Sequence, residues 1–294
     1  MISRVNAPGM AQTAMRHLQA NLTQLARLQE QATSTRAFAT PSENPNGTAT
    51  VLGLHADQRR NTQYARNIDD GLAWVTTVDS AITASTSLLS RVRNLTVQGA
   101  NDGSMSPTAK EAIAVELEGL RDSLLAQANT TVAGRTVFAG TSDAGAAFAP
   151  DYSFNGIAGS EVTRRVSDSA TVRVDADGAE VFGVGNDSVF ALVDRIIADL
   201  RGGVNVGTHL SAIDDRRTAM LGAQGAVGAR QNQLERAKEA TVGESVSLEA
   251  RRSAVENVDS VEVLVRLQSQ ELVYRSALAV TGRVLQPSLM DFLS

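Results

Sequence analysis

The chain has no cysteine among its 294 residues, which excludes a disulfide scaffold, a thiol nucleophile and a cysteine-based metal site. Aromatic residues make up only 4%, and 136 residues without proline separate Pro150 from Pro287. Because helix interiors exclude proline, such tracts permit long helices. No apolar run reaches the roughly 18 residues of a transmembrane helix. The first residues lack the apolar core and cleavage site of a removable signal peptide, so we expect none.

Charge and catalytic motifs are equally uninformative for enzyme chemistry. The net charge of −5 and the pI of about 5.3 argue against a nucleic-acid binder, which would carry a basic face. His17, His55 and His209 lie far apart and fit exposed helical positions better than a metal or catalytic site. Residues 175–178 (Asp-Ala-Asp-Gly) lack the remaining ligands of a calcium loop and are interpreted as a hairpin turn. We therefore expect no enzymatic activity, no cofactor and no bound metal.

Apolar periodicity predicts long helices on both sides of a central non-helical segment. Asn44 is expected to cap the second helix, with Pro45 at its first position, and Gly134 to lie just past the third. Residues 101–104 are expected to end the second helix, and the glycines at 222, 225 and 228 indicate close helix packing. The expected helices cover residues 9–35, 46–100, 107–133, 188–201, 208–241 and 245–286.

The segment between residues 136 and 185 differs in composition from the rest. Six of the eleven aromatic residues fall within 138–190, and glycine is frequent there. Alternating apolar and polar residues at 171–174 predict a strand. We expect a small β domain that projects outward from the helices and tolerates change, because the backbone of such an excursion is satisfied locally.

The two ends of the chain carry narrow apolar seams at the spacing of a coiled coil. A single helix with such a seam is marginal alone in water, so the seam needs a partner. Two interpretations stay open: the seams pair within one chain, or they remain loose and are buried only between subunits. The residues expected to form this assembly interface are Met15, Leu18, Leu22, Leu25, Val258, Val261, Val265, Leu272 and Leu278.

Several motifs resemble those of the flagellin superfamily, and within it the proteins of the hook–filament junction. The resemblance covers nearly all of the chain and is strongest at both ends. Its motifs are Pro41-Ser42-Glu43-Asn44-Pro45, residues 120–125 (LRDSLL), 134–140 (GRTVFAG), 228–235 (GARQNQLE), 256–262 (ENVDSVE) and 288–293 (SLMDFL). The chain departs from the family at residues 34–36, Ser-Thr-Arg, where Gly-Lys-Arg is usual, and at Glu43-Asn44, where the family has an acidic pair.

This resemblance implies a non-enzymatic, extracellular building block of the bacterial flagellum. It implies export through the flagellar type III apparatus without cleavage of a signal, with an export chaperone guarding the C-terminal helix beforehand. The implied assembly partners are the hook-side junction protein (hook-associated protein 1), flagellin and copies of the chain itself in a ring. Neither a nucleic acid nor a membrane is an expected partner.

The expected fold is mainly α with a small β insertion: a long antiparallel helical bundle or coiled coil formed by the N- and C-terminal regions, with a β-rich middle domain. Residues 1–42 with 251–294 would form a terminal assembly domain, 43–135 with 186–250 a helical bundle, and 136–185 the outward β domain. Two alternatives remain, a flagellin that forms the filament itself and a cytoplasmic coiled-coil signalling scaffold. The scaffold would require nearly continuous heptads through a hairpin tip.

Overall fold

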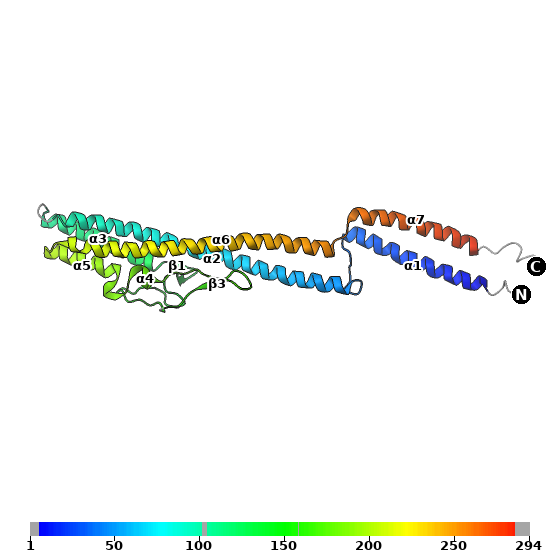
Figure 1. Ribbon diagram of the computed structural model, residues 1–294, viewed down its shortest axis with the longest axis horizontal. Helices are drawn as coiled ribbons and strands as arrows, with labels where there is room; N and C mark the ends of the chain where they lie inside the picture. The colour runs from blue at the N-terminus through cyan, green and yellow to red at the C-terminus, as the bar shows by residue number, and fades with distance from the viewer. Residues whose placement is uncertain (1–5, 102–104, 158, 286–294) are drawn as a thin grey trace, which may run out of the picture. The chain divides into compact units, whose positions relative to one another are not determined.

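A computed structural model describes residues 6–101, 105–157 and 159–285 of the chain. It confirms a mainly α fold with a small β part (Figure 1). The expected helix end at 102–104 and the motif at 288–293 lie outside the described residues. The elements in order are α1 (Asn6–Ser34), α2 (Pro45–Gly99), α3 (Pro107–Ala128), β1 (Thr131–Val132), β2 (Arg135–Thr136), β3 (Thr163–Arg165), β4 (Thr171–Arg173), α4 (Gly178–Phe182), η1 (Gly185–Asp187), α5 (Val189–Gly202), η2 (Val206–His209), α6 (Leu210–Glu256) and α7 (Ser260–Leu285).

Local capping chemistry sets where the main helices begin. The Asn44 side chain accepts a hydrogen bond from the Gly47 amide at 2.9 Å, and Pro45 is the first residue of α2. The hydroxyls of Ser106 and Ser188 cap α3 and α5 in the same way. Gly203 ends α5 in the left-handed conformation, with φ of 72°. The predicted starts of these three helices are confirmed.

The chain divides into two compact units. One comprises residues 1–59 and 245–294, and the other comprises residues 60–244. The first unit contains α1 and α7 with the adjoining ends of α2 and α6, and the second contains everything between. The domain boundaries expected from the sequence differ from this division and stay a prediction.

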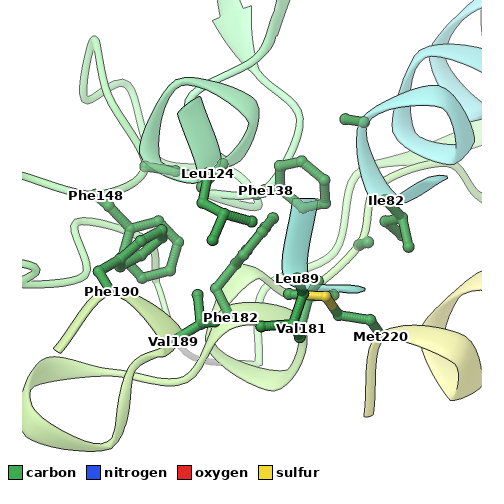
Figure 2. Packing of buried hydrophobic residues seen from close by; sticks show 14 of the residues in the cluster. Ile82, Leu89, Leu124, Phe138, Phe148, Val181, Phe182, Val189, Phe190 and Met220 are labelled. Atoms are coloured by element: carbon green, nitrogen blue, oxygen red, sulfur yellow. The ribbon is translucent and has the colours of Figure 1, made fainter. Parts of the chain in front are cut away.

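The 60–244 unit is held by one aromatic core to which both the helices and the middle segment contribute. Phe138 and Phe182 meet edge to face with ring centroids 5.1 Å apart, and Phe148 meets Phe190 of α5 at 5.3 Å. Figure 2 shows these rings together with side chains of α2, α3 and α6. The aromatic residues of the middle segment thus pack into the core of the helices instead of forming a core of their own.

Two short antiparallel ladders make up the β part. β1 pairs with β2, with Thr131 opposite Thr136, and β3 pairs with β4. Ala133 and Gly134 both have positive φ, 50° and 79°, which is the backbone of a tight two-residue hairpin. The expectation that Gly134 ends α3 was therefore wrong, because α3 stops at Ala128 and the glycine serves the hairpin that follows.

Residues 175–178 do not form the expected hairpin turn. β4 pairs with β3 upstream of it, and within the described residues the chain continues into α4 without a further strand. The Asp177 side chain accepts a hydrogen bond from the Ala179 amide at 2.9 Å and caps α4. Asp175 is buried, where it accepts from the Val162 amide at 3.1 Å and pairs with Arg173 at 2.8 Å.

The expected break near residue 242 is absent, and α6 runs without interruption from Leu210 to Glu256. One interior glycine costs a helix only about 1 kcal/mol, which so long a packed helix absorbs. The break falls instead before Asp259, whose carboxylate accepts from the Val261 amide at 2.8 Å and starts α7. The glycines at 222, 225 and 228 have open space where a side chain would lie, so the close packing expected of them is not found within the chain.

We predict that Phe148→Ala destabilises the 60–244 unit by about 3–5 kcal/mol and lowers its melting temperature by about 10 °C, because Phe148 is fully buried among aromatic rings. The matched control is Ile157→Ala in the same segment, since Ile157 is 57% exposed. Thermal unfolding followed by circular dichroism measures both. Equal melting temperatures for the two variants would contradict the shared core.

A second prediction concerns Tyr152, whose hydroxyl donates to Asp194 of α5 at 2.6 Å. Burial and this hydrogen bond raise the pKa of Tyr152 from 10 to about 12. The folded chain therefore holds the proton more tightly than the unfolded chain, and the resulting stabilisation is complete below pH 10 and lost toward pH 12. Between these values, urea unfolding should show a steeper loss of stability for the unaltered chain than for Tyr152→Phe. Parallel pH profiles would refute this.

Candidate assembly surface on the terminal helices

Within the unit formed by the chain ends, α1 and α7 lie side by side (Figure 1). The less exposed positions of both helices alternate in steps of four and three residues, as in a coiled-coil seam. On α1 the series is Ala14, Leu18, Asn21, Leu25, Leu28 and Ala32, and on α7 it is Val263, Leu267, Gln270, Tyr274, Ala277 and Thr281; Gln31 and Glu271 are less exposed positions that adjoin it. One stripe of residues on each helix is therefore covered by the other helix of the same chain.

Burial along this seam is uneven. Leu28 and Val263, near the linkers, are each only 5% exposed. Farther along, the seam contains a polar pair, in which the Gln270 amide nitrogen lies 3.4 Å from both the backbone and side-chain oxygens of Asn21. Beyond it lie Leu18 and Tyr274, and then the small residues Ala14 and Ala277. The most buried apolar residues of the seam are thus those nearest the linkers.

The structure separates the nine predicted interface residues into two groups. Leu18 and Leu25 lie in the seam between α1 and α7, and Val258 is half-buried in the linker that precedes α7. The other six are exposed and have no partner in the described chain that covers them. They are Met15 (54% exposed), Leu22 (49%), Val261 (71%), Val265 (62%), Leu272 (67%) and Leu278 (44%).

Sequence reasoning missed further members of both groups. Leu28 and Val263 belong to the seam, and Leu264, Val273 and Val280 add to the exposed apolar surface of α7. The signal that finds the seam is the regular step of four and three on both helices, which becomes visible once alanine, asparagine and glutamine are accepted as seam residues. We call the exposed apolar residues of α1 and α7 the outer apolar surface: Met15, Leu22, Val261, Leu264, Val265, Leu272, Val273, Leu278 and Val280.

A shallow apolar groove adjoins this surface. Its lining includes Leu18 of α1 and Leu272, Val273, Ala277 and Val280 of α7. His17, expected as an exposed helical residue, is exposed and borders the groove. Apolar grooves between paired helices are where side chains of a further helix can insert.

Charge is scarce on α1, which contributes Met15 and Leu22 to this surface. α1 has three charged residues among 29, Arg16, Arg27 and Glu30, whereas α6 has fourteen among 47. The remaining polar residues of α1 are mostly Gln, Asn and Thr. Uncharged polar groups cost less to remove from water than charges, and the cores of protein interfaces are depleted of charge. The composition of α1 therefore suits a surface that becomes covered.

Three other features of the described part of the chain concern metal binding, membrane insertion and the histidines. No group of three or more His, Asp or Glu side chains there is placed to hold a metal ion. None of the helices within residues 6–101, 105–157 and 159–285 is long and apolar enough to cross a membrane. His209 is not the exposed residue that was expected: its ring is half-buried, and its Nε2 lies 2.7 Å from an Asp199 carboxylate oxygen.

Known proteins of the bacterial flagellum are similar to this chain in sequence. Residues 5–143 match the family described as the bacterial flagellin N-terminal helical region. Flagellar hook-associated protein 3 of Salmonella typhimurium is 28% identical over 60% of the chain, and that of Escherichia coli K12 is 26% identical over 74%. The matched regions span 59% and 66% of those two relatives. Flagellin A of Vibrio anguillarum is 31% identical over 46% of the chain and 35% of its own length.

Solved structures show the same fold at lower sequence identity. Flagellar hook-associated protein 3 from Legionella pneumophila superposes with a TM-score of 0.61 at 16% identity, covering 70% of this chain and 98% of the other. FlgL of Xanthomonas campestris gives a TM-score of 0.61 at 19% identity, covering 68% and 99%. The helical bundle with its short β insertion is thus a known architecture.

The polar pair in the seam leads to a third prediction. Asn21→Leu with Gln270→Leu should strengthen the α1–α7 pair by about 1–3 kcal/mol, because two apolar side chains replace a long hydrogen bond and leave no polar group unpaired. Hydrogen exchange of the α1 amides should slow by about tenfold or more. Asn21→Leu alone is the control and should gain less, since Gln270 would lose its partner. A double variant that exchanges no more slowly than the unaltered chain would rule out this account of the seam.

Proposed function

We propose that the chain is a flagellin-superfamily protein and a structural subunit of the flagellum at the junction between hook and filament. Residues 5–143 match the N-terminal helical region of bacterial flagellin, which supports the family, and two relatives named hook-associated protein 3 support the junction. These two relatives match 60% and 74% of the chain's length. The proposed role is one of assembly, without enzymatic activity or cofactor, and the proposed location is extracellular.

The outer apolar surface is the observation that carries this proposal. Val261, Val265 and Leu272 are each more than 60% exposed on the α7 side away from the seam. Covering one such side chain stabilises an assembly by about 1.5–3 kcal/mol. A chain that leaves a row of them uncovered is suited to bury them against neighbouring subunits.

The proposed partners follow from this position in the flagellum. Copies of the chain would form a ring, with the hook-side junction protein (hook-associated protein 1) on one side and flagellin on the other. Before assembly, the chain would pass through the flagellar type III export apparatus without a cleaved signal, and an export chaperone would cover the C-terminal helix. The names of the relatives support a flagellar setting, and the apolar helix α7 supports the need for a covering protein.

The two alternatives are less well supported. Flagellin A, the relative that would indicate a filament subunit, matches only 46% of the chain, whereas the hook-associated proteins 3 match 60% and 74%. A coiled-coil signalling scaffold needs heptads through a hairpin tip. Here residues 129–188 hold two β ladders and an aromatic core between the helices.

Deletion of the gene in its own host tests the junction role directly. We expect cells with intact hooks and no filaments, and flagellin released into the medium. The first flagellin subunits would lack the junction protein on which they assemble. Re-expression of the chain should restore filaments. Filaments that persist on the deletion strain would refute the proposal.

The fourth prediction tests the outer apolar surface by itself. Val265→Asp should leave the chain folded and exported but unable to assemble, because each subunit would bury an unpaired carboxylate at a cost of several kcal/mol. The matched control is Val115→Asp on α3, where the valine is 55% exposed, against 62% for Val265. Electron microscopy counts the filaments, and the medium is assayed for the exported variant. Normal filaments with Val265→Asp, or their loss with both variants, would exclude this surface.

A further inference from the structure

Two linkers join the α1–α7 pair to the helices that continue the chain: residues 35–44 lead from α1 to α2, and residues 257–259 lead from α6 to α7. Although more than 200 residues apart in sequence, they meet in an antiparallel β-bridge between Arg36 and Asn257. The Ala37 amide donates to the Glu256 carbonyl at 2.7 Å, and the Val258 amide donates to the Thr35 carbonyl at 3.1 Å. Residues 35–37 therefore supply one donor and one acceptor, and so do Glu256, the last residue of α6, and Val258 together.

Thr35 adopts an unusual backbone conformation to make this contact. Its φ is 58°, in the left-handed region that a β-branched residue seldom occupies and that costs about 1 kcal/mol or more. Its amide still bonds the Gln31 carbonyl at 2.9 Å and closes the last turn of α1, while its carbonyl turns to Val258. Strain of this kind persists where surrounding contacts fix it, and here the bridge is that contact.

A buried carboxylate fastens the same point. Glu256 is only 7% exposed, and its Oε1 lies 3.2 Å from an Arg36 guanidinium nitrogen, while its Oε2 pairs with Arg252. Arg252 also pairs with Glu249 at 2.6 Å, and Glu249 accepts from the Gln58 amide of α2 at 3.0 Å. A side chain so little exposed to water depends on the two guanidiniums for its polar partners. The first linker is thereby tied to α6 and, through α6, to α2.

A further hydrogen bond completes the arrangement on the α1 side. The Gln31 side-chain amide donates to the Ala37 carbonyl at 2.8 Å, so the linker residue that donates to Glu256 is also held by α1. Leu28 and Val263, the most buried residues of the α1–α7 seam, lie next along the two helices. The bridge thus closes the strongest end of the seam.

We propose that residues 35–37 and 256–258 form a clamp that couples the two linkers, so that α1 and α7 are held and released together and not one at a time. We call these six residues the linker clamp. Release of either strand removes a hydrogen bond from the other and leaves the Glu256 carboxylate short of a cation. The inference concerns the chain itself and is independent of its proposed role in the flagellum.

Engineered disulfides test whether the linkers are held together in the full chain. In Arg36→Cys with Asn257→Cys, the bridge places the two residues as a non-hydrogen-bonded pair, whose Cα atoms are about 4.5 Å apart and within the range of a disulfide. The chain has no other cysteine, so only this bond forms within it. The control pair is Ala39→Cys with Asn257→Cys, which lies on the same linkers outside the bridge. We expect the first pair to oxidise at least about tenfold faster. Equal rates would overturn the clamp.

Hydrogen exchange of the full chain tests the coupling. Glu256→Gln keeps the size of the side chain and removes its charge, and we expect the Ala37 and Val258 amides to exchange about tenfold faster, both by a similar factor. Glu262→Gln, which removes an exposed α7 carboxylate paired with Arg266, should change neither. The α5 amides should be unaffected and report that the 60–244 unit stays folded.

Three outcomes would overturn the coupling: acceleration of only one of the two amides, acceleration of neither, or the same effect from Glu262→Gln. If Glu256→Gln also exposes the α5 amides, the chain has unfolded more widely, and Thr35→Gly replaces it as the variant. Glycine relieves the strain at position 35 without removing a charge. The exchange rates of the Ala37 and Val258 amides should then still change together, by a similar factor.

Discussion

The pairing of α1 with α7 through one narrow seam is the constraint on which the ends of the chain depend. Each helix gives one stripe of alternating spacing to the pair, and neither helix would be stable alone in water. The seam brings the first and last described helices together across the whole length of the sequence. The seam also determines which apolar residues remain exposed, because side chains buried between α1 and α7 cannot contact another subunit. Leu18 and Leu25 are used in this way, whereas Val265 and Leu272 are not.

The middle of the chain is organised by a different interaction, the packing of aromatic rings. The protein has few aromatic residues, and six of its eleven lie within residues 138–190, where the chain leaves the long helices and returns to them. Phe148 meets Phe182 of α4 at 5.8 Å and Phe190 of α5 at 5.3 Å. The excursion has two ladders too short to be stable alone, so its order depends on these contacts with helical residues.

The sequence predicts those features that are determined locally. The starts of α2, α3 and α5 follow from Asn44, Ser106 and Ser188, because a capping side chain acts within three residues of itself. Tertiary packing decided the rest. A pattern of large apolar residues placed Leu22 in the seam, but the true seam passes through Asn21, whose partner lies 249 residues away. Gly243 does not stop α6, and Asp177 starts a helix instead of turning a hairpin, since each depends on what packs around it.

The candidate surface was therefore half predictable, and the reason is geometric. Periodicity identifies helices with apolar residues on them, but it does not say which of several apolar rows a neighbour takes. α7 is apolar on more than one side: Val263 and Leu267 face α1, while Val261, Val265 and Leu272 do not. A single partner helix covers one side only, so α7 holds more apolar surface than α1 can satisfy. The scarcity of charge on α1 points the same way, since an outward helix face meant to remain in water would ordinarily carry more charge than Arg16, Arg27 and Glu30 provide. Both helices thus leave surface uncovered within the described chain, apolar on α7 and poor in charge on α1.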